Sequence, residues 1–189
     1  MTAPLVVLIG PPGAGKSRIG KAVARDLGVR FVDTDRVIVG RHGPISKIFA
    51  DYGEPRFRAI EREIVRAALL GEIEGPGDEA SGDTVLALGG GAILDPDTQS
   101  ELSDHRVALI TVTTEAVRGR LNTSKRPLLA GGIDAWERLA SERRSIYEAL
   151  ATSVWDTSHR PVSHIARELA DWVRDAAGQQ KNELEKENS

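Results

Sequence analysis

Residues 5–17, LVVLIGPPGAGKS, decide the fold of this chain. The five apolar residues at 5–9 predict a short buried strand, and a glycine-rich stretch from Gly10 to Ser17 follows it directly. Beyond this stretch Ile19, Val23 and Leu27 recur at steps of four, which indicates a helix. A strand, a G-x-x-x-x-G-K-[ST] turn and a helix together predict a phosphate-binding loop, in which backbone N–H groups and the helix N-terminus bind phosphates.

The same loop supplies candidate nucleotide ligands. Lys16 would reach the β- and γ-phosphates of a nucleoside triphosphate, and Ser17 would ligate Mg²⁺. The strand before the loop and the helix after it argue against the alternative of a chance glycine-rich turn. Many ATPases, GTPases and kinases share this loop, so it predicts a ligand without fixing a reaction. The candidate ATP-binding residues in it are Gly13, Ala14, Gly15, Lys16, Ser17 and Arg18.

The composition narrows the class of protein. The chain has 189 residues, 40% of them hydrophobic, which suits one α/β domain that we place at residues 1–177. It has no cysteine, which excludes disulfides, thiolate zinc sites and a cysteine nucleophile. No apolar run is long enough to cross a membrane, and the N-terminus has no export signal. A net charge of −3 argues against nucleic-acid binding. We expect a cytoplasmic monomer without nucleic-acid or membrane partners.

Short apolar runs alternate with amphipathic stretches, which predicts a parallel sheet covered by helices on both faces. The expected strands are Leu5–Ile9, Arg30–Val32, Val85–Leu88, Arg106–Val112 and Val154–Trp155. We expect Asp95, followed by Pro96, to cap one helix, and Thr114 and Asp134 to cap later ones.

Two segments fall outside this alternation. Residues 71–83 are acidic and glycine-rich, which predicts a mobile surface loop. Residues 178–189 contain a single large apolar residue, which predicts a disordered polar tail.

The second predicted strand is followed by Asp33-Thr34-Asp35. The carboxyl ends of parallel strands face the ligand crevice, so both carboxylates should lie near the phosphate loop. On an extended backbone, a spacing of two places both side chains on one side. One carboxylate would then serve the Mg²⁺ shell while the other orients an acceptor hydroxyl. The alternative is that one of them caps the next helix.

The third predicted strand is followed by Gly89-Gly90-Gly91, where a Walker B motif would end in a metal-binding aspartate. Bare glycines there would let a small polar ligand approach the backbone closely, and a plain tight turn is the alternative.

Three arginines are candidates for binding an anion. Arg58 has Glu61 three residues ahead on a predicted helix, Arg126 begins an Arg-Pro-Leu-Leu stretch, and Arg143 lies on the helix after that stretch. For each one taken alone, an exposed surface charge is the interpretation that the sequence favours.

Five ordered landmarks together resemble the shikimate kinase family, over residues 5–172. They are the phosphate loop, DTD at 33–35, FxxxGExxFRxxE from Phe49 to Glu61, LGGGA at 88–92 and RPLL at 126–129. The resemblance implies a three-layer α/β/α P-loop kinase with a five-stranded parallel sheet in the order 2-3-1-4-5. It also implies an acceptor-binding region at about 35–69 and a lid at about 120–134. The implied reaction is MgATP plus shikimate giving shikimate 3-phosphate and ADP.

The resemblance also implies roles for individual residues. Lys16, Asp35 and Arg126 would be catalytic, and Ser17 and Asp33 would hold Mg²⁺. The shikimate-binding residues would be Asp35, Arg58, Gly89, Gly90, Gly91 and Arg143. Arg120, in preference to Arg118, and Arg160 would lie beside the adenine of ATP. The alternatives are another small-molecule kinase, such as gluconate kinase, or a nucleotide-binding module without turnover.

Overall fold

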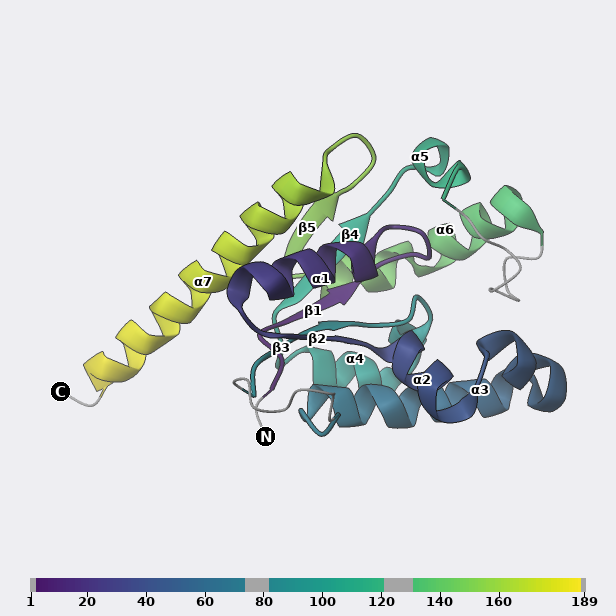
Figure 1. Ribbon diagram of the computed structural model, residues 1–189, viewed down its shortest axis with the longest axis horizontal. Coiled ribbons are helices and arrows are strands. Elements are labelled where there is room, and N and C mark those ends of the chain that lie inside the picture. The colour runs from purple at the N-terminus through teal and green to yellow at the C-terminus, as the bar shows by residue number, and fades with distance from the viewer. Residues whose placement is uncertain (1–2, 74–81, 121–130, 188–189) are drawn as a thin grey trace.

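The computed structural model describes residues 3–73, 82–120 and 131–187. Strands and helices alternate along the described chain (Figure 1). In order, they are β1 (Val6–Ile9), α1 (Lys16–Leu27), β2 (Arg30–Asp33), α2 (Thr34–His42), α3 (Ile45–Leu69), β3 (Thr84–Ala87), the 3₁₀ helix η1 (Ala92–Leu94), α4 (Pro96–Leu102), β4 (Val107–Thr111), α5 (Thr114–Arg118), α6 (Gly132–Leu150), β5 (Ser153–Asp156) and α7 (Val162–Glu187).

The five strands form one parallel sheet in the order β2-β3-β1-β4-β5, which confirms the predicted order. β1 is the central strand, with Val7 in register with Leu86 of β3 on one side and with Val107 of β4 on the other. The strand order reverses at β1, and in open parallel sheets the ligand crevice opens at such a point. The loop after β1, the α2–α3 pair and the start of α6 all lie at this end of the molecule (Figure 1).

Alternate residues of the strands enter two separate cores, which makes the molecule three layers thick. Val6, Leu8 and Ile110 are buried with apolar residues of α1 and α7. Val7 and Leu109 are buried on the opposite face, with residues of α3, α4 and the end of α6. The three inner strands β1, β3 and β4 therefore consist almost entirely of apolar residues, because both of their faces are covered by helices, whereas the edge strands β2 and β5 are half polar.

A glycine sets how closely α1 approaches the sheet. A Cβ atom at Gly20 would lie 2.3 Å from Cε2 of Phe31 and 3.0 Å from Cδ1 of Leu8. Gly20 is buried one turn after the start of α1. The ring of Phe31 therefore fills the space that a side chain at residue 20 would need.

The α2–α3 pair has its own small core beside the sheet, formed by Ile38, Ile48, Phe57, Ile60 and Ile64. The axis of α3 is interrupted at Gly53, where φ is 76°. The second half of α3 then runs against the sheet, with Phe57, Ile60, Ile64, Val65, Ala68 and Leu69 on its buried side.

The structure corrects two predicted helix caps and confirms a third. Asp95 caps α4 and accepts a hydrogen bond from the Thr98 amide, as predicted. Thr113, and not Thr114, caps α5, because the Thr113 hydroxyl accepts from the Ala116 amide. Asp134 lies inside the first turn of α6, which begins at Gly132 with Gly131 as its N-cap.

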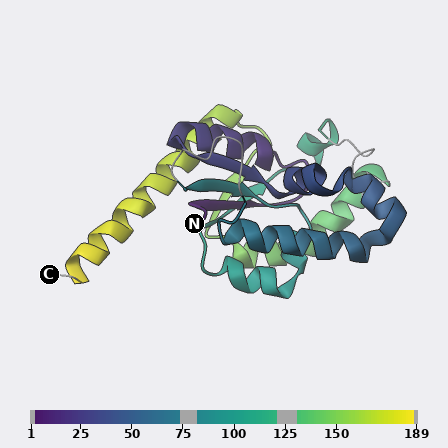
Figure 2. The ribbon, with the colours of Figure 1, turned by 60° about the horizontal axis from the view of Figure 1, so that its bottom comes forward.

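In the structure α7 continues to Glu187 (Figures 1 and 2), and the predicted disorder of residues 178–189 stays a prediction. Residues 178–187 have few apolar side chains but many helix-forming ones, namely Gln, Lys, Glu and Leu. The division of the chain at residue 177 stays a prediction. No helix in the described ranges is both long and apolar enough to cross a membrane.

Candidate active site

The phosphate loop joins β1 to α1 and needs glycine for two different reasons. Gly10, Gly13 and Gly15 have φ values of 138°, 83° and 98°, which side chains disfavour. A Cβ atom at Gly10 would also lie 2.1 Å from the carbonyl oxygen of Ile110 in β4. The loop is therefore pressed against the sheet where it leaves β1, and α1 begins at Lys16 with its N-terminus at the end of the loop.

Side chains hold the carbonyl groups of this loop. Lys16 Nζ donates to the carbonyls of Gly10 at 2.6 Å and Pro11 at 3.2 Å. Trp136 Nε1 donates to the Pro12 carbonyl at 2.7 Å, and Thr157 Oγ1 donates to the Ala14 carbonyl at 2.8 Å. With the carbonyls bound in this way, the N–H groups at the start of α1 form the anion-binding side of the loop.

Ser17 and Asp33 meet beside the loop. Ser17 Oγ donates to Asp33 Oδ2 at 2.5 Å, and Asp33 Oδ1 caps α2 by accepting from the Arg36 amide at 3.3 Å. Asp33 therefore caps the next helix, which the sequence presented as an alternative, and its Mg²⁺ role stays a prediction. In the described part of the chain no cluster of three or more metal-binding side chains exists. Two adjacent oxygens fit Mg²⁺, which usually takes its other ligands from phosphates and water.

Asp35 faces the triple glycine, but its backbone conformation differs from the predicted one. It lies in the first turn of α2 and not on extended backbone, because the strand ends at Asp33. A Cβ atom at Gly89 would lie 2.6 Å from Asp35 Oδ1 and 2.8 Å from Glu61 Oε1. Two carboxylates thus converge on Gly89, whose own amide donates to Thr34 Oγ1 at 3.0 Å.

Arg58 lies against the last of the three glycines. Its Nη1 donates to Glu61 Oε2 at 2.5 Å, and its Nη2 lies 2.9 Å from Glu54 Oε1. A Cβ atom at Gly91 would be 2.2 Å from Nη1 of Arg58. The side chain of Glu61 is 5% exposed, so the interpretation of this pair as an ordinary surface pair is wrong. Burial raises the pKa of the Glu61 carboxyl, and the guanidinium of Arg58 opposes that shift.

The middle glycine is held by α6. Arg143 Nη1 and Tyr147 Oη donate to the Gly90 carbonyl at 2.9 Å and 2.5 Å. Both side chains are buried, so Arg143 is not the surface charge that the sequence alone favoured. Burial also raises the pKa of the Tyr147 hydroxyl, which therefore stays protonated and donates. Sequence reasoning missed Tyr147 and Trp136, although both lie on the same helical face as Arg143, four positions after it and seven before.

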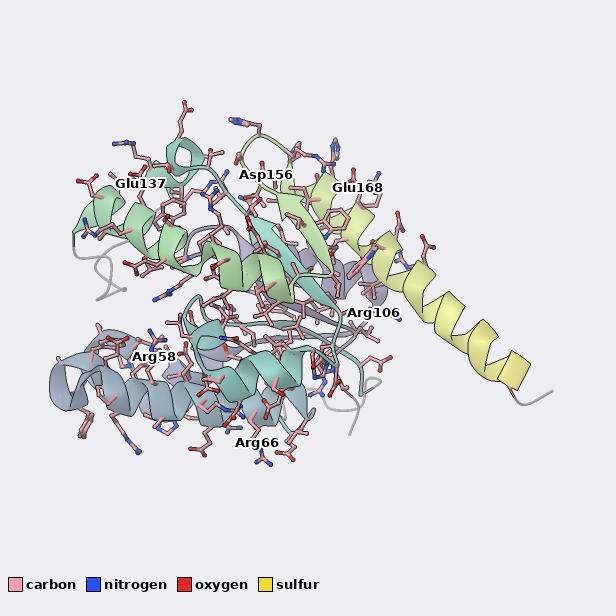
Figure 3. The ribbon with its side chains drawn as sticks, turned by 180° about the vertical axis from the view of Figure 1, so that it is seen from behind. Arg58, Arg66, Arg106, Glu137, Asp156 and Glu168 are labelled. Carbon is pink, nitrogen blue, oxygen red and sulfur yellow. The ribbon has the colours of Figure 1, made fainter. Side chains whose placement is uncertain are left out.

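The remaining predicted arginines lie in different surroundings. Arg120 donates from Nη1 to the hydroxyl of Thr157 at 3.2 Å and from Nη2 to its carbonyl at 3.1 Å. Arg160 forms an exposed ion pair with Glu168 of α7. Figure 3, which shows the molecule from behind, labels Glu168 on this helix. Arg18 and Arg118 are exposed. Arg126 and most of the predicted lid lie outside the described residues.

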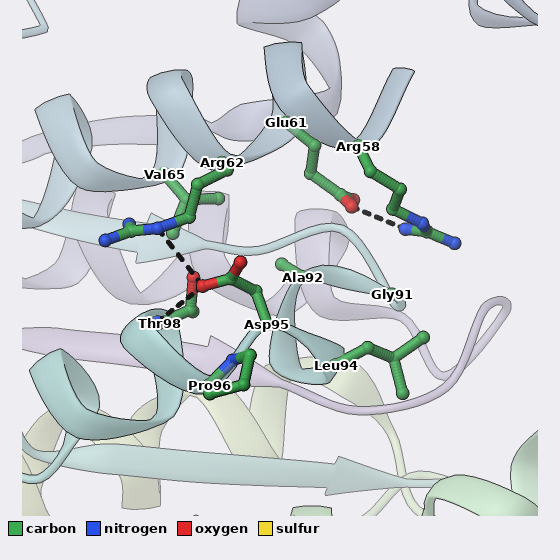
Figure 4. A pocket seen from close by; sticks show the side chains of 10 residues that line it. All are labelled: Arg58, Glu61, Arg62, Val65, Gly91, Ala92, Leu94, Asp95, Pro96 and Thr98. Carbon is green, nitrogen blue, oxygen red and sulfur yellow. Dashed lines mark hydrogen bonds and ion pairs between the residues drawn. The ribbon is translucent and has the colours of Figure 1, made fainter. Parts of the chain in front are cut away.

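A cavity of about 310 Å³ opens between α3 and the η1–α4 segment (Figure 4). Arg58, Glu61 and Gly91 border it on the side of the glycines. On its other side, Arg62 forms ion pairs with Asp95 at 3.1 Å and Glu101 at 2.6 Å. The second half of α3 is thereby tied to both ends of α4, which helps to fix Arg58 and Glu61 beside the glycines.

The sheet order, the phosphate loop and the carboxylates and arginines gathered beside it define a P-loop kinase that acts on a small molecule. The family model described as shikimate kinase matches residues 12–174. The chain belongs to the shikimate kinase family and is an ATP-dependent kinase.

Relatives and solved structures support this assignment. The chain is 43% identical to the shikimate kinase of Streptomyces coelicolor over 176 residues, covering 92% of this chain and 97% of the relative. It is 46% identical to that of Thermobifida fusca over 174 residues, covering 88% and 95%. A solved structure of the shikimate kinase of Acinetobacter baumannii in complex with shikimate matches with a TM-score of 0.80 and 27% identity, covering 93% of this chain and 95% of that one.

Proposed function

We propose that this kinase transfers the γ-phosphate of MgATP to the 3-hydroxyl of shikimate, giving shikimate 3-phosphate and ADP. The observation that carries the proposal is the direct contact between the phosphate loop and the triple glycine. A Cβ atom at Gly90 would lie 3.0 Å from Cδ of Pro12. A donor bound on the loop and an acceptor bound at the glycines would therefore be neighbours, as phosphoryl transfer requires.

The acceptor side offers one partner for each kind of group on shikimate. Arg58 and Arg143 bind the carboxylate, because both guanidinium groups lie at the glycines and are partly or fully buried. The backbone at Gly89, Gly90 and Gly91 meets a ring hydroxyl, since glycines have no side chain of their own to keep a ligand from the backbone. Asp35, which faces Gly89, accepts a hydrogen bond from the hydroxyl that receives the phosphate.

The donor side is the phosphate loop. The backbone amides of Gly13, Ala14 and Gly15 bind the phosphates, together with Arg18. Lys16 offsets the negative charge that develops on the γ-phosphoryl group during transfer. Ser17 would hold Mg²⁺ directly and Asp33 would hold it through water, and the ion would neutralise negative charge on the phosphates. Arg126 closes over the phosphates from the lid. Arg120 and Arg160 lie beside the adenine.

In the reaction, the oxygen of the 3-hydroxyl forms a bond to the γ-phosphorus while the bond to the bridging oxygen breaks. The bridging oxygen leaves with the electron pair as part of ADP, and the hydroxyl proton passes to Asp35. The residues position the two substrates and offset charge, which accounts for most of the catalysis in this class of reaction.

The acceptor is tested by measuring ADP release from MgATP in the presence of shikimate, gluconate or nucleoside monophosphates. We expect turnover with shikimate alone. Turnover confined to gluconate would support the alternative of a gluconate kinase, and nucleotide binding without turnover on any acceptor would support a binding module.

The carboxylate clamp is tested by Arg58→Ala and Arg143→Ala. Removing one partner of a buried charge pair costs about 2–5 kcal/mol, so shikimate affinity should fall about 30-fold or more while ATP affinity persists. Binding of each substrate is measured separately by titration calorimetry. Arg144→Ala is the matched control, because Arg144 is the next residue of α6 and is exposed. Wild-type shikimate binding in both variants would contradict the assignment.

A further inference from the structure

One helix holds both substrate loops. Trp136 of α6 donates to the Pro12 carbonyl of the phosphate loop at 2.7 Å. Eleven residues later, Tyr147 of the same helix donates to the Gly90 carbonyl of the Gly89–Gly91 loop at 2.5 Å, where Arg143 also donates at 2.9 Å. The three side chains repeat at steps of seven and four and so share one face of α6.

The hydrogen bonds from Trp136 and Tyr147 come from buried side chains on a rigid helix. Trp136 and Tyr147 are each 3% exposed, so neither hydrogen bond competes with bulk water. About 16 Å of helix separates the two aromatic residues, a length that an α-helix holds with little bending. Trp136 packs in the core shared with α1 and α7, whereas Tyr147 packs in the core on the other face of the sheet. The helix is therefore anchored at both points independently of the loops.

The phosphate loop and the Gly89–Gly91 loop need a support that fixes the distance between them. They leave adjacent strands, β1 and β3, and Gly90 of one loop lies against Pro12 of the other. A glycine loop carries little intrinsic stiffness, because glycine is the residue with the most backbone freedom. Phosphoryl transfer, by contrast, requires the reacting atoms to lie about 3–3.5 Å apart, and a misplacement near 1 Å can cost about a hundredfold in rate.

We propose that Trp136 and Tyr147 are positioning residues, and that α6 acts as a strut that sets the distance between the phosphate loop and the Gly89–Gly91 loop. The role rests on the proposed function, because its purpose is the spacing of ATP and shikimate in the complex with both. Neither side chain needs to touch a substrate. The strut acts only when both attachments are intact.

The experiment compares Trp136→Phe, Tyr147→Phe and the double variant. Each change keeps an aromatic ring and removes one hydrogen-bond donor. We expect each single variant to lower kcat by about tenfold or more, while the affinity for ATP alone stays within about twofold of wild type. In Trp136→Phe the affinity for shikimate alone should also stay within about twofold, whereas Tyr147 interacts directly with Arg143 and its removal can also weaken shikimate binding. The double variant should be no slower than the slower single variant, because either change already breaks the strut. Trp155→Phe is the matched control, since it removes an indole donor from Ser153 on β5, which belongs to neither loop.

A second readout does not depend on the reaction. Amide hydrogen exchange in Trp136→Phe should rise at residues 89–91, which Trp136 does not contact, and in Tyr147→Phe it should rise at residues 10–15. Trp155→Phe should leave both loops unchanged.

Three results would overturn the proposal. The first is a lower unfolding temperature with wild-type kcat, which indicates a purely structural role. The second is a double variant whose kcat falls by the product of the two factors measured in the single variants. The third is faster exchange confined to the loop that the altered residue contacts. Absence of shikimate turnover in the wild-type protein would instead refute the proposed function and leave the exchange result to decide whether α6 couples the loops.

Discussion

The three consecutive glycines after β3 are required for space rather than for backbone conformation. Among the described glycines, positive φ angles occur elsewhere and not at residues 89–91. The atoms that would meet a Cβ there belong to Asp35, Glu61, Pro12 and Arg58. The glycines therefore let side chains from the phosphate loop, α2 and α3 converge on one short stretch of backbone.

Gly89→Ala tests this requirement. The new methyl group would displace the carboxylates of Asp35 and Glu61, which are the ends of flexible side chains, so the fold should survive. We expect kcat to fall by about tenfold or more, because Asp35 loses its orientation toward the acceptor. Steady-state kinetics and thermal unfolding are measured side by side. Gly119→Ala is the control, because no atom lies within 4 Å of a Cβ atom there. Wild-type kcat in Gly89→Ala would mean that the Asp35 carboxylate is not constrained by this contact.

His105, between α4 and β4, makes stability depend on pH. Partial burial lowers the pKa of its imidazole below the usual 6.5. As pH falls below 6.5, the unfolded chain takes up this proton before the folded chain does, so the free energy of unfolding falls until the pH passes the folded pKa. We expect the unfolding temperature of wild type to drop more than that of His105→Gln between pH 8 and pH 5.5. Parallel drops in the two proteins would show that His105 makes no such contribution.

Among the structural elements, the sequence predicted strands and helices well and side-chain environments poorly. All five strands were found within a residue or two, because buried parallel strands are nearly pure apolar runs. The positions of Lys16 and Ser17 at the start of α1 could be predicted, because the phosphate-loop motif requires a strand before it and a helix after it. The burial of Glu61 and Arg143 could not be predicted, since a charge on an amphipathic helix is usually exposed. Trp136 and Tyr147 were missed because their spacing equally fits an ordinary apolar helix face.

Errors at element boundaries had a common cause. Asp35 was predicted on extended backbone, but the Asp33 side chain caps α2 and so starts the helix one residue before Asp35. Thr113 displaced Thr114 as the cap of α5 in the same way. A capping side chain fixes the first residue of a helix through one hydrogen bond. The pattern of apolar residues does not indicate which of two neighbouring polar residues makes that bond.

For the whole molecule, α7 is expected to divide into a part that the fold needs and a part that it does not. Leu169 is fully buried in the core that α7 shares with α1, so Leu169→Ala should lower the free energy of unfolding by about 2–5 kcal/mol. A chain that ends at Ala177 should unfold at nearly the wild-type temperature and keep its activity, because the last twelve residues offer a single large apolar side chain. Chemical denaturation compares the three proteins. A large loss of stability on truncation would mean that the end of α7 packs against the body.

Gly20 links the packing of α1 on the sheet to the position of the phosphate loop. The ring of Phe31 occupies the place that a side chain at residue 20 would need, so α1 lies directly against Phe31 and Leu8 there. A larger residue at position 20 would have to push the Phe31 ring aside or move α1 away from the sheet. Because α1 begins at the end of the phosphate loop, a movement of the helix would also move the N-terminal amides that are proposed to bind the phosphates.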